Sequence, residues 1–339
     1  MVEQNTKIQK AKLLNKLLIV VLMLIIICIF IALLIGNYFV NYALLRTGNG
    51  GDRKVKDSES ISVVNIENSE KIIIEENKNK ENQLVSEWVQ KINSQKVMVT
   101  APDGIILRGT EYIADEKANK WAIILHGYRS NPDSVISIGR HFSVDGYNVL
   151  IPSMRASNES DGKYIGMGWL DKEDLKCWLN LIIQRNNNAK IILHGSSMGA
   201  ATVLMASGDE LPKNVKAIIA DSGYTSVYDI FASEAKARFN LPAFPLLNMF
   251  EFVANIRAKY DIKEASALEQ VKKANIPILF IHGDADDFVP EYMCEELFKA
   301  TNCKKEKLII KHAGHIESKF QDPEMYYNKI FSFIEDTGF

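Results

Sequence analysis

The segment that most restricts the fold of this chain is residues 191–201, where an apolar run, a serine between two glycines and an Ala-rich stretch follow one another. Residues 191–193 predict a buried strand, and the Ala-rich residues after the serine predict a helix. Gly195 and Gly199 flank Ser197 in the pattern G-x-S-x-G, which is typical of a sharp turn that exposes a serine hydroxyl. A serine is a weak nucleophile until a base accepts its proton. The segment therefore predicts a nucleophilic Ser197 at a strand-to-helix turn.

The length and charge of the chain restrict its class. A chain of 339 residues can hold one large α/β domain and additional segments. A formal net charge of −2 gives no basic surface for nucleic acid. The four cysteines, Cys28, Cys177, Cys294 and Cys303, lack C-x-x-C spacing and predict neither a metal site nor a disulfide framework. Cys294 could pair with Cys303, but burial as an ordinary apolar side chain is the preferred interpretation. We expect no cofactor, because the sequence has no metal-ligand cluster and no phosphate loop.

The apolar run at residues 17–35 contains no polar side chain. As a helix rising about 1.5 Å per residue, it nearly spans a hydrocarbon core of about 30 Å. Tyr38, Phe39 and Tyr42 follow where the aromatic residues of a membrane interface lie. A cleaved signal peptide has a shorter apolar region and an A-x-A-like site, and neither is present here. Burial in the core is a poor explanation for a helix that is apolar all round and lies at the extreme N-terminus. We therefore expect an uncleaved membrane anchor.

Lysines close to the apolar run predict its orientation. Lys7, Lys10, Lys12 and Lys16 precede the run, whereas the basic residues after it are further away and mixed with acidic ones. Positive charges favour the cytoplasmic side. We expect a single-pass protein of the cell membrane with its catalytic domain outside the cell.

The composition divides the chain into four parts. Residues 1–16 form a short cytoplasmic segment and residues 17–42 a transmembrane anchor. Residues 43–83 are polar and highly charged, which predicts a flexible linker because such a segment cannot bury enough apolar surface to fold. Within it, the apolar residues at 71–75 could be locally ordered. Residues 84–339 form the catalytic domain, with a small helical cap at about residues 228–270.

Short apolar runs alternate with helical patterns in this domain. We expect strands at residues 97–99, 105–107, 121–125, 148–151, 189–193, 217–220, 278–281 and 307–310. We expect helices near Trp88 and at residues 133–142, 169–185, 198–207 and 292–300. This alternation predicts an α/β fold with a mostly parallel sheet covered by helices on both faces.

The ends of these strands carry the residues with chemical potential. Ligands of such sheets lie beyond the carboxyl ends of the strands. Ser197, Asp286 and His315 each follow a strand, in the chain order of the α/β-hydrolases. Ser197 would attack an acyl carbonyl, His315 would transfer its proton, and Asp286 would orient the imidazole. Backbone N–H groups of Tyr128 and Met198 would bind the oxyanion.

The acid has several candidates after one strand. Asp286 lies between Gly283 and Pro290 at a spacing that turns one carboxylate inward. Asp284 and Asp287 are interpreted as capping or solvated residues. Asp221 also stays a candidate, because it follows a neighbouring strand.

The base has one competitor. His312 follows its strand too closely to reach a nucleophile, whereas Ala-Gly before His315 provides a freer loop. His126, His194 and His282 each precede a glycine at the end of a strand, and we interpret them as structural residues.

From about residue 88 to residue 333 the chain resembles the bacterial α/β-hydrolases of the esterase and serine-aminopeptidase-like superfamily, especially the membrane-anchored or secreted hydrolases of Gram-positive bacteria. The resemblance rests on the segments Ser-Glu-Trp, Ala-Pro-Asp-Gly, His-Gly-Tyr-Arg-Ser-Asn, Gly-Met-Gly-Trp-Leu-Asp, His-Gly-Ser-Ser-Met-Gly-Ala-Ala-Thr, Asp-Ser-Gly-Tyr-Thr-Ser and His-Gly-Asp-Ala-Asp-Asp-Phe-Val-Pro. It implies a triad of Ser197, Asp286 and His315, with Tyr128 and Met198 at the oxyanion hole.

One loop departs from the pattern of these relatives, which is Asp-x-Arg-x-x-Gly-x-Ser-x-Gly. Arg155, Ser160 and Gly162 match it, whereas Ser153 and Asn158 replace the aspartate and the first glycine. The departure concerns the geometry of the 153–162 loop and substrate preference rather than the triad.

The leading hypothesis is a membrane-anchored serine hydrolase that cleaves carboxylic esters or related small acyl compounds. The alternatives are a serine peptidase, an aminopeptidase or an acyltransferase on the same triad, since water, an amine or an alcohol can each resolve an acyl-enzyme. A catalytically silent surface binding protein is the alternative from another class.

Overall fold

An eight-stranded sheet forms the centre of the structure, a computed structural model that describes residues 2–50 and 64–338. The strands lie in the order β1-β2-β4-β3-β5-β6-β7-β8. Strand β2 pairs antiparallel with β1 and β4, and the other pairings are parallel. The strands are β1 Asn93–Thr100, β2 Ile106–Ile113, β3 Lys120–Leu125, β4 Asn148–Pro152, β5 Lys190–Ser196, β6 Val215–Asp221, β7 Ile278–Gly283 and β8 Lys305–Ile310.

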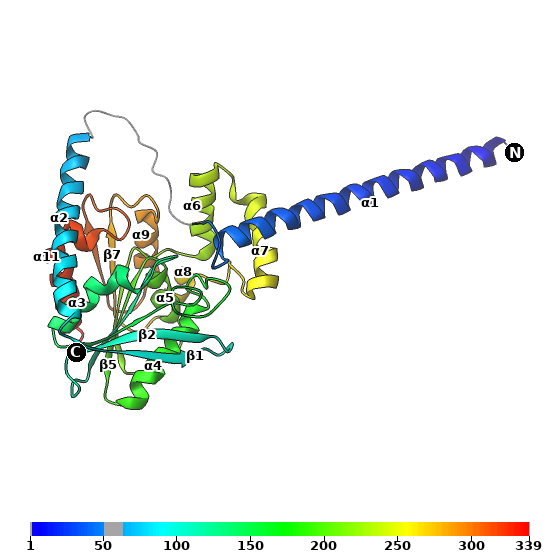
Figure 1. Cartoon of the computed structure of the whole chain (residues 1–339). Coiled ribbons are helices and arrows are strands. Elements are labelled where there is room, and N and C mark those ends of the chain that lie inside the picture. The colour runs from blue at the N-terminus through cyan, green and yellow to red at the C-terminus, as the bar shows by residue number, and fades with distance from the viewer. Residues whose placement is uncertain (1, 51–63, 339) are drawn as a thin grey trace.

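Helices cover both faces of this sheet, because its central strands are apolar on both sides (Figure 1). In β3, for example, Ile123 and Ile124 point into two different apolar clusters and both are fully buried. One face carries α3 Ile136–Val144 and α11 Pro323–Glu335, and the other carries α4 Asp171–Arg185, α5 Met198–Ala206, α8 Ala267–Val271 and α9 Glu291–Ala300. The short helices η1 Pro132–Val135 and α10 Ser318–Gln321 complete the connections. The prediction of an α/β-hydrolase fold with a mostly parallel sheet is confirmed.

The cap consists of two helices, α6 Val227–Phe239 and α7 Ala243–Ala258. The Ser226 hydroxyl caps the start of α6 by accepting the N–H of Asp229, and Asn240 ends the helix in the left-handed region at φ 54°. Helix α8 lies within the residues we expected for the cap, but it packs against α5 beneath them. The cap is thus shorter than the sequence predicted.

Helix α1 Val2–Ala43 leaves the body of the molecule as a long rod (Figure 1). Its segment Lys12–Ala43 is long and apolar enough to cross a membrane, and its most apolar stretch is not buried inside the protein. The end of α1 behaves differently: Gly36, Val40 and Ala43 are buried, and this part packs on α7.

Helix α2 Val64–Val89 corrects the expected flexible linker. We expected residues 43–83 to be an unfolded polar tether, but residues 64–83 are helical and residues 43–50 lie against the domain. The buried Glu81 pairs with Arg140 and His141 of α3, and the Asn77 amide donates to the Phe320 carbonyl. These tertiary contacts order a segment whose composition alone does not favour folding. Residues 51–63 of the expected linker lie outside the described residues.

Candidate active site

Ser197 stands at the turn between β5 and α5 with φ 55° and ψ −115°. Residues other than glycine rarely adopt this backbone conformation, and such backbone strain is typical of functional turns. The flanking glycines are required by close approach: a Cβ on Gly195 would lie 2.1 Å from the Gly199 carbonyl oxygen, and one on Gly199 would lie 2.3 Å from the Leu125 carbonyl oxygen. The G-x-S-x-G pattern therefore reflects tight packing of strand, turn and helix beneath Ser197.

Ser197, His315 and Asp286 form a continuous hydrogen-bonded chain. His315 Nε2 lies 2.8 Å from Ser197 Oγ, and His315 Nδ1 lies 2.7 Å from Asp286 Oδ2. Because an ionised carboxylate only accepts, Nδ1 carries the proton and Nε2 is left to accept the serine hydroxyl. Three loops that follow β5, β7 and β8 supply these side chains. The structure thus brings together the three residues that the sequence singled out.

Asp286 is held as a carboxylate by its neighbours. Its Oδ1 accepts the N–H groups of Phe288 and Val289 at 3.0 and 2.8 Å. Burial acts to raise its pKa, but hydrogen bonds from His282 and His315 outweigh burial and hold the pKa of Asp286 well below its usual range. The carboxylate is therefore fixed in position and charged when it meets the imidazole.

The competing acids lie elsewhere. Asp284 is exposed and accepts the backbone N–H of His312 at 2.6 Å, and Asp287 is exposed as well. Asp221 is fully buried, and its carboxylate accepts the Tyr326 hydroxyl at 3.0 Å instead of contacting His315. His312 is exposed. Asp286, by contrast, contacts His315 at 2.7 Å.

The three histidines interpreted as structural are fully buried. The ring of His126 accepts the Met154 N–H through Nε2 and therefore donates from Nδ1 to the Gly127 carbonyl, at 3.1 and 2.9 Å. Burial lowers the pKa of His126 to about 4 and that of His194 to about 3. His282 differs, because its Nε2 lies 3.3 Å from Asp286. Burial acts to lower its pKa, but Asp286 outweighs it and helps raise the pKa to about 10. His282 thus supports the acid directly.

The loop after β3 lies over the serine. A Cβ on Gly127 would lie 3.7 Å from Ser197 Oγ, so the backbone that leads to Tyr128 passes directly beside the hydroxyl. Met198 is the first residue of α5, where backbone N–H groups have no partner inside the helix. The Tyr128 side chain reaches the end of α1 and donates its hydroxyl to the Ala43 carbonyl at 2.6 Å. The two backbone segments expected at an oxyanion hole, at Tyr128 and Met198, therefore flank Ser197.

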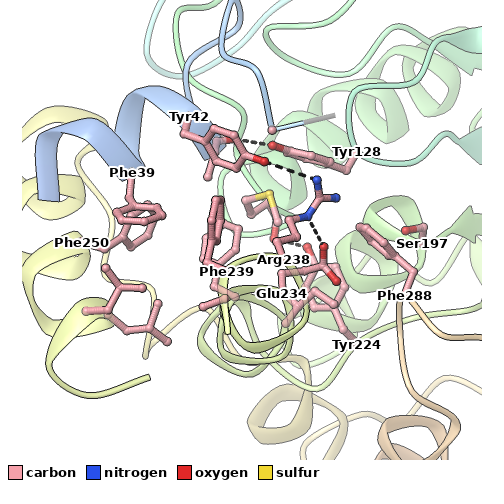
Figure 2. A pocket seen from close by; sticks show the side chains of 18 residues that line it. Phe39, Tyr42, Tyr128, Ser197, Tyr224, Glu234, Arg238, Phe239, Phe250 and Phe288 are labelled. Atoms are coloured by element: carbon pink, nitrogen blue, oxygen red, sulfur yellow. Dashed lines mark hydrogen bonds and ion pairs between the residues drawn. The ribbon is translucent and has the colours of Figure 1, made fainter. Parts of the chain in front are cut away.

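A pocket with about 700 Å³ of empty space, part of it open solvent, lies beside Ser197 (Figure 2). Helices α6 and α7 supply much of its lining, including Phe239 and Phe250. Phe39 and Tyr42 of α1 line it as well. The sequence suggested that these two residues are part of an aromatic belt at the membrane interface. Their spacing of three residues on one helix face was the only local sign that they share a partner.

The 153–162 loop accommodates its two departures locally. Asn158 adopts φ 42°, a left-handed conformation that asparagine tolerates, and its amide lies 3.4 Å from Ser153 Oγ. Arg155 is buried and pairs bidentately with Asp174, and Ser160 Oγ donates to the Ser153 carbonyl at 2.6 Å. The two altered positions therefore meet each other in the loop.

Among the described residues, no group of three or more His, Cys, Asp or Glu side chains could hold a metal ion.

Comparison with known proteins identifies similar sequences. A family model described as alpha/beta hydrolase fold matches residues 121–253. The protein YqkD of Bacillus subtilis is 27% identical over 255 residues, which cover 75% of this chain and 83% of that protein. The protein YfhR of Escherichia coli K12 is 25% identical over 252 residues, covering 71% and 81%.

Solved structures share the fold. An esterase of Pyrococcus furiosus superposes with a TM-score of 0.59 and 23% identity, covering 72% of this chain and 93% of the esterase. An acylaminoacyl peptidase of Pyrococcus horikoshii gives a TM-score of 0.56 and 16% identity, covering 72% of this chain and 41% of the peptidase. The matching family model, the solved structures, the strand order and the turn at Ser197 agree that the chain has the alpha/beta-hydrolase fold.

Proposed function

We propose that this protein is a serine hydrolase that cleaves carboxylic esters through an acyl-enzyme. The observation that carries the proposal is the hydrogen-bonded chain from Ser197 Oγ through His315 to Asp286, with distances of 2.8 and 2.7 Å. Ser197 is the nucleophile, His315 the general base and acid, and Asp286 the carboxylate that orients the imidazole.

Acylation begins when Ser197 Oγ attacks the ester carbonyl carbon. The hydroxyl proton passes to His315 Nε2, and the carbonyl oxygen becomes an oxyanion that faces the N–H groups of Tyr128 and Met198. The bond to the alkoxy group then breaks, and His315 gives its proton to the departing oxygen. The products of this half are an alcohol and an acylated Ser197.

Deacylation repeats the steps with water. His315 accepts a proton from water as the water oxygen attacks the acyl carbon, and the same N–H groups bind the new oxyanion. The bond to Ser197 Oγ breaks and the serine recovers its proton from His315. Asp286 keeps its charge throughout and stabilises the imidazolium in both halves. The net reaction consumes one ester and one water and yields an alcohol and a carboxylic acid.

The N-terminal helix anchors this hydrolase in the cell membrane, with the hydrolase domain outside the cell. What supports the anchor is the exposure of the apolar side chains of α1, since a soluble protein rarely exposes so large an apolar surface. The lysines before the apolar run support the orientation. An epitope tag at the C-terminus should bind antibody on intact cells. Binding only after permeabilisation would place the domain inside.

The reaction is tested with the full chain in detergent on p-nitrophenyl esters, beside aminoacyl p-nitroanilides. Wild type and Ser196→Ala should hydrolyse the esters, and Ser197→Ala should not. Ser196 is the matched control, because it is equally buried next to Ser197 and its hydroxyl has no polar partner among the described residues. Faster cleavage of the anilides would favour a peptidase. Absence of both activities in wild type would favour a binding protein.

A further inference from the structure

The pocket extends from the serine to the end of the anchor helix. Figure 2 shows Ser197 on one side, Phe39 and Phe250 on the other, and Phe239 between them. Phe39 and Phe239 pack edge to face with ring centroids 5.4 Å apart. A side chain of the expected transmembrane segment thus forms part of the wall of the cavity that reaches Ser197. We call this surface, made by Phe39, Tyr42, Phe239 and Phe250, the α1–cap wall.

Close packing fixes α1 against the cap. A Cβ on Gly36 would lie 2.3 Å from the Met249 carbonyl oxygen and 2.8 Å from the Val253 side chain, so the two helices cross in direct backbone contact. Arg257 of α7 also bonds to Asn37 of α1. The position of the α1–cap wall therefore depends on a glycine at one helix crossing, rather than on a loose tether.

Hydrogen bonds fix the same end of α1 to the loop over the serine. The Tyr128 hydroxyl donates to the Ala43 carbonyl, and Arg129 Nη2 donates to the Leu45 and Tyr42 carbonyls at 2.8 and 3.1 Å. The last carbonyls of a helix lack partners within it and attract cations. Arg129 therefore clamps the end of α1 to the loop that carries the Tyr128 N–H.

The character of the pocket suits a hydrocarbon chain. Its lining is mainly aromatic and aliphatic, as is typical of sites for apolar ligands. The charged side chains in it, Glu234 and Arg238, pair with each other at 2.5 Å, and Arg238 also contacts the Tyr42 hydroxyl at 3.4 Å. Opposite charges that are paired present little net charge to an apolar ligand.

The outside of the cap is also apolar. Phe252 and Ile256 lie one turn apart on α7 and are 57% and 63% exposed, and Phe244 at the start of α7 is 74% exposed. These side chains lie on α7, the helix that α1 crosses at Gly36. Gly36 directly follows the most apolar part of α1. An exposed apolar patch beside a membrane helix is suited to contact with lipid.

We propose that the substrate is a membrane-resident ester with a long acyl chain, and that this chain lies along the α1–cap wall while its carbonyl meets Ser197. The ester leaves the bilayer at the foot of α1, so the anchor both holds the enzyme and completes its acyl pocket. The reaction is the hydrolysis already described and yields a fatty acid and the free alcohol. This inference rests on the proposed serine hydrolase function.

Chain-length preference tests the wall. The full chain in detergent is assayed with p-nitrophenyl butyrate and p-nitrophenyl palmitate, as wild type, Phe39→Ala and Phe30→Ala. Phe30 is the matched control, because it lies on the same helix and is 60% exposed, away from the pocket. Phe39→Ala should lower the palmitate-to-butyrate ratio of kcat/KM about tenfold, because a few methylenes lose their apolar contact. Phe30→Ala should leave the ratio unchanged.

If the palmitate-to-butyrate ratio is unchanged in Phe39→Ala, the proposal is overturned, whether both rates stay as in wild type or both fall by the same factor. The underlying function is judged separately, on butyrate. If Ser197→Ala keeps butyrate hydrolysis, the serine hydrolase proposal fails. If butyrate hydrolysis depends on Ser197 but wild type shows no preference for palmitate, only the lipid inference fails.

Delivery from the membrane has its own measurement. Full-length protein is reconstituted in phosphatidylcholine vesicles that contain 4-methylumbelliferyl palmitate, or in vesicles mixed with separate vesicles that contain the ester. Hydrolysis should be about tenfold faster when enzyme and ester share a bilayer, because a shared bilayer raises their effective concentration. Soluble 4-methylumbelliferyl butyrate normalises the amount of active enzyme. Equal normalised rates in the two arrangements would contradict entry from the bilayer.

Discussion

The Ser197–His315–Asp286 cluster and the α1–cap wall meet in one cavity but are built in different ways. The cluster comes from loops directly after neighbouring strands of one sheet, so the sheet itself brings its members together. The wall comes from a helix more than a hundred residues earlier in the chain and from the cap, and helix crossing and a clamp hold it. This difference separates the chemistry from the choice of substrate, and each part can be altered alone.

The largest expected effect is the loss of the acid. Asp286→Asn should lower kcat for p-nitrophenyl butyrate about 10³- to 10⁴-fold, because a neutral amide can no longer hold the His315 tautomer or stabilise the imidazolium. Asp221→Asn is the control, since its carboxylate bonds to Tyr326 and does not contact His315. Circular dichroism checks that both variants are folded. A loss of equal size in a folded Asp221→Asn would show that the assignment of the acid to Asp286, after β7, is wrong.

A smaller effect comes from the buried histidine under the loop that carries the Tyr128 N–H. Burial lowers the pKa of His126 from 6.5 to about 4, so below pH 6.5 the unfolded chain binds a proton that the folded chain does not. The free energy of unfolding should therefore fall as the pH drops from about 6.5 to about 4. At pH 4.5 the contribution of His126 to this loss is roughly 2 to 3 kcal/mol.

Urea unfolding of wild type and His126→Gln at pH 7 and pH 4.5 measures this contribution. The variant should lose less stability on acidification than wild type. His312→Gln, at an exposed position, is the control and should behave like wild type. The same acid sensitivity in His126→Gln would show that the buried ring is not responsible.

The smallest effect concerns the link between the two regions. Arg129→Ala should lower kcat for butyrate about tenfold and leave KM nearly unchanged, because the loop that carries the Tyr128 N–H loses its clamp and orients the oxyanion donor less well. Arg129 is a positioning residue, so Arg129→Lys should recover part of the rate. Arg257→Ala is the control, since Arg257 also binds α1 but lies away from this loop. Equal losses in both alanine variants would indicate a general loosening of α1.

The two regions also differ in how far the sequence predicts them. The contact among Ser197, His315 and Asp286 could be predicted, because strand ends in a parallel sheet meet at one edge and each residue directly follows a strand. The choice of Asp286 over Asp221 could be argued only from loop spacing. The geometry shows the reason: the Asp221 carboxylate accepts a hydrogen bond from the Tyr326 hydroxyl. Tyr326 lies on α11, a helix that the sequence did not predict.

The α1–cap wall could not be predicted in this way. An apolar run indicates a membrane helix but not which of its side chains meet the folded domain, so Phe39 and Tyr42 were interpreted as interfacial. Only the end of α2, near Trp88, was predicted, for a related reason: Glu81 has its partners on α3, and a polar segment gives no local sign of a distant ion pair. Periodicity reports the local environment of a helix, whereas these contacts are made between elements far apart in the chain.

The central claim, that Ser197 is an activated nucleophile, is tested most directly by covalent labelling. The full-length protein is treated with a fluorophosphonate probe, digested and analysed by mass spectrometry. We expect one adduct, on Ser197, in wild type and none in Ser197→Ala. In Asp286→Asn the adduct on Ser197 should form much more slowly than in wild type. No adduct in folded wild-type protein, or an adduct on another serine that persists in Ser197→Ala, would contradict the account.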